Sequence, residues 1–368
     1  MIETWQQDLP HGITLSCRAS GERGRPVLMF LHGFPEAAFV WDTLLEHFAR
    51  PEHGGYRCVA PNLRGYEHSS APAQVRDYRA KYLVQDIVAL MDAECGAGQP
   101  VAALIAHDWG GGIAWNLANQ HPARLHQLVI INSPHPGTFL RELQSSPAQQ
   151  AASAYMNFLV RPDAAARLAE NDYQRLFGFF EGMGAAAPAG TLGAPIGSGW
   201  LTPALRAQYR AVWDRGLDGG LNYYRASPLR PATAQDPGAS AVQLPPEMLH
   251  IPQPTLVLWA QGDIALLPGM CEGLERFVPQ LTLVPLHQAT HWVVHEQPER
   301  VIAEIARFLK TQYTPGSPAG RVLKRRCTQW YCSGMVRMNP ASSSFMRIVS
   351  ATRSSVGNCA SGGCTSMV

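Results

Sequence analysis

The sequence lacks the features of a membrane or secreted protein. No run of apolar residues approaches the roughly 20 that a transmembrane helix needs. The first residues, Met1 to Asp8, contain neither the basic end nor the apolar stretch of a secretory signal peptide. We therefore expect no membrane span and a cytoplasmic location.

Patterns that bind metals are also scarce. No His-Glu-x-x-His segment occurs, and His287, His291 and His295, although four residues apart, straddle an expected strand-to-loop junction rather than one helix face. Four cysteines near the end of the chain lack the two-residue spacing of a zinc site; they are Cys327, Cys332, Cys359 and Cys364. The other four are scattered, which is typical of free thiols in a reducing compartment. We expect no metal and no cofactor, with a zinc site at the late cysteines as the lesser alternative.

Acidic residues are absent after Thr314, although the whole chain of 368 residues has a net charge of only +2. This last segment contains seven Lys or Arg, which leaves 23 basic and 28 acidic side chains in the preceding residues. A body of mildly negative charge offers no footprint for nucleic acid. The segment is rich in Ser, Gly and Arg and sustains no periodic pattern, so we expect residues 315–368 to form a basic, disordered tail.

What the chain does have is an alternation of short apolar runs and amphipathic stretches. The runs at Val27 to Leu31, Tyr56 to Ala60, Val101 to Ala106 and Leu128 to Ile131 are typical of strands buried on both faces. Between them, Leu83 to Met91 has the spacing of one apolar helix face. Buried strands that alternate with helices predict a mainly parallel α/β sheet.

This rhythm breaks between residues 137 and 246, where no clear strand pattern occurs. Gly, Ala and Pro separate helix-like pieces at Tyr155 to Leu168, Asp172 to Phe180 and Leu205 to Trp213. Strand patterns resume at Thr255 to Trp259 and Leu281 to Val284, and Pro298 begins a last helix. The sequence therefore predicts a core made of residues 1–136 and 247–314, with residues 137–246 inserted as a helical cap.

The segment Ala106-His-Asp-Trp-Gly110 joins a buried strand to a helix and has the small-x-nucleophile-x-small pattern of a nucleophile elbow. Small residues flank such a turn because larger side chains would clash where the backbone crosses tightly. Serine is the usual nucleophile at its apex, and here the residue is Asp108. The carboxylate therefore determines which chemistry the chain can perform.

Two further ionisable residues follow later strands. Asp263 comes directly after Trp259-Ala-Gln-Gly262, and His291 comes after the next strand. Singly, Asp108 reads as a helix cap, Asp263 as a turn residue and His291 as a surface histidine. Together they have the nucleophile, acid, base order of an α/β-hydrolase triad, and parallel strands place such residues at one edge of the sheet.

His32-Gly-Phe-Pro35 ends the Val27 to Leu31 strand. In combination with an elbow, this turn would place the backbone N–H of Phe34 beside that of Trp109. Two such donors form an oxyanion hole. The alternative is a simple strand-ending turn.

These segments resemble those of the α/β-hydrolase-fold epoxide hydrolases. The resemblance rests on His32-Gly-Phe-Pro-Glu36, His107-Asp-Trp-Gly-Gly111, Asp263 and His291-Trp292, and it covers roughly residues 5–312. It implies an α/β-hydrolase fold with a mainly parallel eight-stranded sheet flanked by helices and an inserted helical cap. It also implies two cap tyrosines that hold the epoxide oxygen, for which Tyr224 in Asn222-Tyr-Tyr-Arg225, rather than Tyr223, and Tyr155 are the candidates. The alternative role for both is packing in the core of the cap.

The residue types fit such a reaction. A carboxylate at Asp108 needs no deprotonation before it attacks a strained ring, and Tyr155 and Tyr224 would protonate the departing oxygen. The resulting ester would be hydrolysed by water that His291 activates, with Asp263 orienting the imidazole, and a vicinal diol would leave. We expect a small hydrophobic epoxide and water as partners, and a monomer or homodimer.

Two other functions remain open at this stage. Haloalkane dehalogenases use the same aspartyl ester, but they typically carry Asn at the position of Phe34, and fluoroacetate-type dehalogenases carry Arg where Gly110 and Gly111 stand. A non-catalytic ligand-binding homologue would typically lack one member of the triad. Assays of halide release and of diol formation separate these possibilities.

Overall fold

The structure is a computed structural model that describes residues 1–183 and 197–312. Its centre is one eight-stranded sheet with the order β1-β2-β4-β3-β5-β6-β7-β8. The β2 strand pairs antiparallel with both neighbours, and all the pairs from β4 to β8 are parallel. The strands are Glu3–Asp8 (β1), Thr14–Ser20 (β2), Val27–Leu31 (β3), Arg57–Pro61 (β4), Val101–His107 (β5), Leu125–Ile131 (β6), Thr255–Ala260 (β7) and Leu281–Leu286 (β8). The expected eight-stranded, mainly parallel sheet is confirmed.

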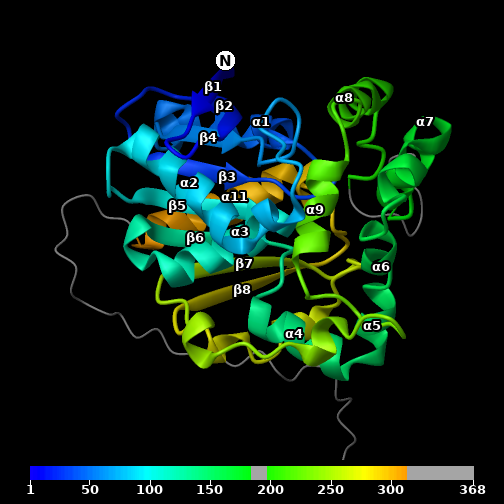
Figure 1. Ribbon diagram of the computed structural model, residues 1–368. Helices are drawn as coiled ribbons and strands as arrows, with labels where there is room; N and C mark the ends of the chain where they lie inside the picture. Colours follow the sequence, from blue (N-terminus) through cyan, green and yellow to red (C-terminus); the bar gives the residue numbers. More distant parts are fainter. Residues whose placement is uncertain (184–196, 313–368) are drawn as a thin grey trace, which may run out of the picture. The chain divides into compact units, whose positions relative to one another are not determined.

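Helices cover both faces of this sheet, as Figure 1 shows. The helices α2 (Ala80–Cys95) and α3 (Asp108–Gln120) pack together on one face, and α1 (Asp42–Ala49) and α11 (Pro298–Gln312) pack together on the other. The central strands β3, β4, β5 and β7 are therefore buried along their whole length. This burial explains why most of their residues are apolar rather than every second one, with Arg57 in β4 as a buried exception.

Between β6 and β7, the described residues form helices and loops only. The helices are α4 (Pro136–Ser145), α5 (Pro147–Ala152), α6 (Tyr155–Leu159), α7 (Ala164–Glu181), α8 (Pro203–Trp213) and α9 (Asp218–Ala226). Figure 1 shows them near the edge of the sheet where β5 ends and α3 begins. They belong to the same compact unit as the sheet. The limits of a separate cap, 137–246, and of the two core segments stay a prediction.

The helix expected from Tyr155 to Leu168 is wrong in detail, because α6 ends at Leu159 and α7 begins only at Ala164. The second expected piece, Asp172 to Phe180, starts too early. Helical geometry in α7 is interrupted, and Asn171, Asp172 and Tyr173 have positive φ angles of 52°, 56° and 61°. Contacts with α8 accompany this turn, since Asp172 pairs with Arg210 and the Tyr173 hydroxyl donates to Asp214 at 2.6 Å.

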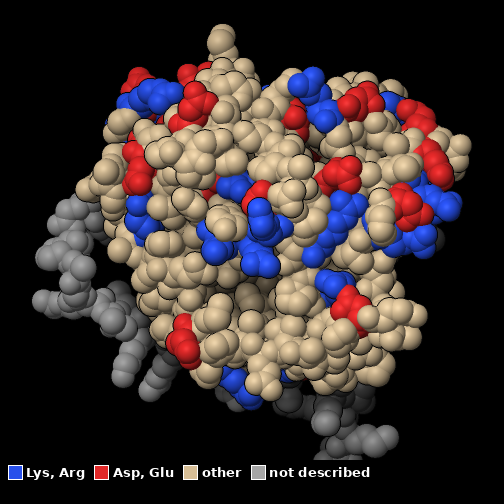
Figure 2. Space-filling model, viewed as in Figure 1, with Lys and Arg blue, Asp and Glu red and all other residues tan. Residues whose placement is uncertain are grey.

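No helix in the described part of the chain is both long and apolar enough to cross a membrane. On the face shown in Figure 2, basic and acidic side chains are interspersed rather than separated into patches of one sign. The expected basic tail, with its late cysteines, lies outside the described residues.

Candidate active site

The Asp108 side chain lies at the apex of the turn between β5 and α3. Its φ angle is +49°, a left-handed conformation that a non-glycine residue rarely adopts and that is typical of a nucleophile elbow. The chain after β3 passes so close that a Cβ on Gly33 would lie 2.2 Å from Asp108 Oδ1. Only glycine fits so close an approach, so the turn after β3 packs directly against the elbow.

The two carboxylate oxygens of Asp108 have different surroundings. Oδ1 accepts a hydrogen bond from the backbone N–H of Phe34 at 2.7 Å. Oδ2 lies 3.7 Å from Nε2 of His291. The backbone carbonyl of Asp108 accepts a hydrogen bond from the Ser133 hydroxyl at 2.7 Å, which supports the turn from the β6 side. One oxygen is thus held by a fixed donor, and the other faces the imidazole.

His291 connects Asp108 to Asp263. Its Nδ1 lies 2.7 Å from Oδ2 of Asp263, which also accepts from the Asn132 amide at 2.9 Å. The other oxygen of Asp263 accepts the backbone N–H groups of Ala265 and Leu266, each at 2.9 Å. Asp263 and His291 are 2% and 5% exposed. The structure therefore brings the three residues of the expected triad together in a buried chain of contacts.

The pKa values of the acid and the base move in opposite directions. Burial opposes ionisation of Asp263, but the charge and hydrogen bond of His291, with the backbone donors and Asn132, hold the pKa of that carboxyl below its usual range. Burial likewise opposes protonation of His291, yet the charges of Asp263, Asp108 and Glu36 raise its pKa to about 9. In the resting protein the imidazole is consequently protonated at neutral pH.

Tyr155 on α6 and Tyr224 on α9 face Asp108 from the helical segment. Their rings are 6.4 Å apart at an interplanar angle of 75°. The Tyr224 ring also packs edge-on against Trp109 at 5.0 Å and Phe34 at 5.4 Å. Burial, followed by nearby charge, raises the pKa of both phenols well above the ordinary value of 10. Both hydroxyls therefore remain protonated and can donate hydrogen bonds.

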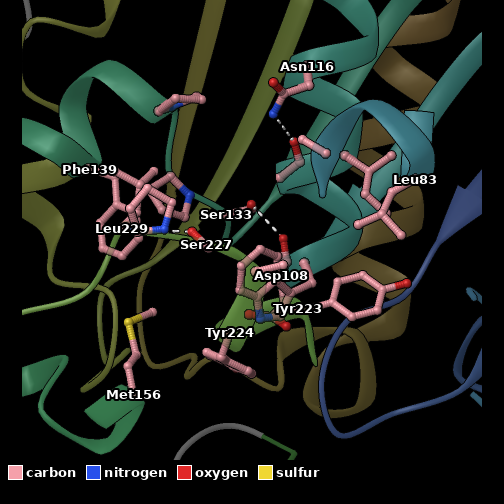
Figure 3. A pocket seen from close by; sticks show the side chains of 18 of the residues that line it. Leu83, Asp108, Asn116, Ser133, Phe139, Met156, Tyr223, Tyr224, Ser227 and Leu229 are labelled. Atoms are coloured by element: carbon pink, nitrogen blue, oxygen red, sulfur yellow. Dashed lines mark hydrogen bonds between the residues drawn. The ribbon is translucent and has the colours of Figure 1, made fainter. Parts of the chain in front are cut away.

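Two cavities meet at Asp108, Tyr155 and Tyr224, which line both of them. The larger, of about 310 Å³, is mostly apolar, and Figure 3 shows Phe139, Met156 and Leu229 on the side away from Asp108. The smaller, of about 230 Å³, contains His291, Phe179 and Trp292 among its lining side chains.

Each cavity extends to an exposed apolar side chain. Met248, which is 45% exposed, lines the larger cavity, and Ile264, which is 58% exposed, lines the smaller one. Among the described residues that line the two cavities, Asp108 and His291 are the only ionisable ones besides tyrosines. The site therefore suits an uncharged, largely apolar molecule.

The two tyrosines of α9 have different surroundings. Tyr223 lines only the larger of the two cavities, and its hydroxyl donates to the Arg64 carbonyl at 2.9 Å. Tyr224 lines both cavities. The choice of Tyr224 over Tyr223 as an epoxide-holding tyrosine stays a prediction. The Phe34 N–H donates to Asp108 Oδ1, and the oxyanion hole expected from the N–H groups of Phe34 and Trp109 stays a prediction.

Three residues that support the site were not predicted from the sequence. Asn132 and Ser133 follow β6 directly. Because residues that follow parallel strands gather at one edge of the sheet, their positions in the sequence indicated that they lie near Asp108 and Asp263. Glu36 is 1% exposed and lies between His107 and His295, which hold its pKa below the usual range despite the opposing effect of burial. The sequence signal for Glu36 was its position, because this carboxylate directly follows the turn His32-Gly-Phe-Pro35.

His287, His291 and His295, which are four residues apart in the sequence, have different surroundings. His291 turns to Asp263, His295 lies 2.8 Å from Glu36, and His287 is exposed. Within residues 1–183 and 197–312, no group of three His, Cys, Asp or Glu side chains has an arrangement that suits a metal ion.

Comparison with known proteins supports what the fold and the site indicate. A family model described as the alpha/beta hydrolase fold matches residues 26–298. Epoxide hydrolase 4 of Mus musculus is 32% identical over 82% of this chain and 77% of its own length. The chain belongs to the α/β-hydrolase-fold epoxide hydrolase family.

Two other known proteins are similar to this chain over most of its length. The AB hydrolase superfamily protein YfhM of Bacillus subtilis is 31% identical over 82% of this chain and 96% of its own length. The crystal structure of a Bacillus megaterium epoxide hydrolase in complex with an inhibitor superposes with a TM-score of 0.72 and 27% identity, and covers 83% of this chain and 100% of that one. The family model spans residues 26–298, a range that contains strands β3 to β8, the helical segment and the residues of the candidate active site.

Proposed function

We propose that this protein hydrolyses epoxides to vicinal diols through a covalent ester on Asp108. The observation that carries the proposal is the position of the Asp108 carboxylate between the imidazole of His291 and the side chains of two tyrosines. Its Oδ2 lies 3.7 Å from the imidazole of His291, and the cavities in front of it are also lined by the hydroxyl-bearing side chains of Tyr155 and Tyr224. Membership of the epoxide hydrolase family supports the same reading.

In the first step, Oδ2 of Asp108 attacks one carbon of the ring and the carbon–oxygen bond to that carbon breaks. The oxygen that leaves stays attached to the neighbouring carbon. Tyr155 and Tyr224 donate hydrogen bonds to it, and one of them supplies a proton. Ring strain makes a carboxylate sufficient as nucleophile once this oxygen is stabilised. The product is a hydroxyalkyl ester of Asp108.

In the second step, water attacks the carbonyl carbon of the ester while His291 takes a proton from it. The charge that develops on Oδ1 is stabilised by the Phe34 N–H, which already donates to this atom at 2.7 Å, and by the N–H of Trp109. Collapse of the tetrahedral intermediate expels the diol with Oδ2, and His291 returns the proton. The oxygen of the water molecule remains on Asp108.

The pKa of His291 explains how a residue that is protonated at rest becomes the base of the second step. The charges of Asp263 and Asp108 raise this pKa to about 9 in the resting protein, against the effect of burial. Formation of the ester removes the negative charge of Asp108, so the pKa of His291 falls. The imidazole then gives up its proton, which restores the tyrosine that protonated the substrate, and the neutral imidazole becomes a base.

A single turnover in water labelled with ¹⁸O tests the proposal. With protein in excess over styrene oxide, we expect the first diol to contain no label, because its new oxygen comes from Oδ2 of Asp108. Label should instead appear in the peptide that contains Asp108. Label in the first diol would mean direct attack by water and would refute the covalent route.

Matched variants and a second substrate class complete this test. Asp108→Asn preserves the shape of the side chain and should abolish diol formation, whereas Asp172→Asn changes an exposed carboxylate, paired with Arg210 on the surface, and should not. Halide release from 1-bromobutane, assayed in parallel, measures the dehalogenase alternative. Faster halide release than diol formation across a panel of epoxides would favour that alternative.

A further inference from the structure

The helix α9 carries two consecutive buried tyrosines, and only one of them is needed to explain the proposed chemistry. The hydroxyl of Tyr223 donates to the backbone carbonyl of Arg64 at 2.9 Å, and its side chain is 1% exposed. Arg64, in the loop after β4, is itself immobilised by a buried ion pair with Asp86, at 2.7 and 2.6 Å, and by the carbonyl of Asp77. The acceptor for Tyr223 is therefore part of a rigid region of the core.

A second contact fixes α9 to the same loop one helical turn earlier. Gly219 of α9 lies against Gly65, and a Cβ on Gly219 would be 2.2 Å from the Gly65 carbonyl oxygen. Residues 219 and 223 are four apart and share one face of the helix. The close backbone contact at Gly219 and the hydrogen bond from Tyr223 together fix the position of α9 along its axis and its rotation about that axis.

This orientation determines where the next side chain points. Successive residues on an α-helix are about 100° apart around its axis. When Tyr223 is held on Arg64, Tyr224 is turned toward Asp108, where its ring packs against Trp109 at 5.0 Å and Phe34 at 5.4 Å. Tyr224 has no hydrogen bond of its own to the loop after β4.

We propose that Tyr223 is a positioning residue for ring opening, which acts by holding α9 on the Arg64 carbonyl so that the Tyr224 hydroxyl is aimed at the epoxide oxygen. The inference depends on the proposed function, because it assigns a role within the first step of that reaction. Tyr223 lines the larger cavity but is not a substrate donor, since its hydroxyl proton is directed to Arg64.

The variant Tyr223→Phe tests this role because it removes one hydroxyl and keeps the ring. We expect ester formation, measured by rapid quenching and intact-protein mass in a single turnover, to slow by about tenfold, since small misplacements of a catalytic group have effects of this size or larger. The rate at which the ester is hydrolysed should change less than twofold, because Asp263 and His291 lie on separate loops. General loosening of the fold would affect both rates.

Tyr66→Phe is the matched control. Tyr66 is 5% exposed and packs against the Tyr223 ring at 5.5 Å, but its hydroxyl has no hydrogen-bond partner within the described residues. Both rate constants should stay within twofold of the unmodified protein. Thermal unfolding of each variant verifies that the folded fraction is the same.

A second variant, Gly219→Ala, perturbs the other contact and leaves Tyr223 in place. Because the new methyl group must push α9 away from Gly65, we again expect slower ester formation with hydrolysis nearly unchanged. Unchanged ester formation in Tyr223→Phe, or an equal loss in both steps in both variants, would overturn the inference alone. Absence of any ester on Asp108 in the unmodified protein would instead overturn the proposed function, and the inference with it.

Discussion

Replacement of Asp263 by Asn separates the two steps of the proposed reaction. The carboxylate accepts four hydrogen bonds: Oδ2 from His291 and Asn132, and Oδ1 from the N–H groups of Ala265 and Leu266. An amide has only one oxygen. If that oxygen stays with the two N–H groups, the new NH₂ faces His291 and forces its Nδ1 to accept, so that the imidazole proton moves to Nε2.

The size of the effect follows from this change of tautomer. An imidazole protonated on Nε2 cannot take a proton from water, and amides at the corresponding position of hydrolase triads slow catalysis by about 10⁴-fold. We expect hydrolysis of the Asp108 ester to slow by about 10³- to 10⁴-fold. Ring opening needs only Asp108 and the two tyrosines, so it should slow by less than about tenfold. The lost hydrogen bonds should lower the free energy of unfolding by about 1–3 kcal/mol.

Intact-protein mass spectrometry after rapid mixing with styrene oxide measures both steps. We expect the Asp263→Asn variant to accumulate the ester, with one substrate mass added to nearly every molecule, while Asp172→Asn, with its exposed carboxylate, behaves like the unmodified protein. If ring opening slows as much as ester hydrolysis, or if no ester accumulates, the assignment of Asp263 and His291 to the second step is wrong.

The other predictions concern stability and the geometry of the first step. Because the pKa of His291 is raised from 6.5 to about 9, its protonated form stabilises the fold fully below pH 6.5 and ceases to do so as the pH rises through 9; urea unfolding should show a loss of ~3 kcal/mol across this interval that His291→Gln abolishes. Tyr155→Phe and Tyr224→Phe should each slow ester formation by about 10- to 100-fold, and the double variant by less than the product, because the two rings are in contact and both hydroxyls act on the same oxygen; additive effects in stopped-flow traces would contradict this coupling. Gly33→Ala places a methyl group 2.2 Å from Asp108 Oδ1, so turnover should fall by more than about 100-fold, and a variant that retains normal steady-state rates would show that the turn after β3 can move away.

The sheet and the ends of its strands could be predicted from the sequence because strands that are buried on both faces appear in it as apolar runs. The runs that form β3, β5 and β7 are apolar throughout, and a change to Gly or to charged residues marks where each ends. Parallel strands end at the same edge, so the approximate positions of Asp108, Asp263 and His291 followed without any knowledge of distances.

The helical segment was harder to predict because tertiary contacts decide its breaks. Nothing in the apolar spacing from Tyr155 to Leu168 indicates the interruption between Leu159 and Ala164. The left-handed turn at Asp172 coincides with its ion pair to Arg210, 38 residues away along the chain. Similarly, the choice between the two tyrosines of α9 is a matter of helix rotation, which depends on where that helix docks.

The two unequal cavities on either side of the nucleophile have a consequence for regiochemistry. An epoxide with a substituent on each carbon can place one group in a space of about 310 Å³ and the other in a space of about 230 Å³. Which carbon then lies over Asp108 Oδ2 depends on how the two groups are distributed between these spaces. Two enantiomers that place the same substituent in the larger space are attacked at the same carbon, and inversion there yields opposite diol enantiomers.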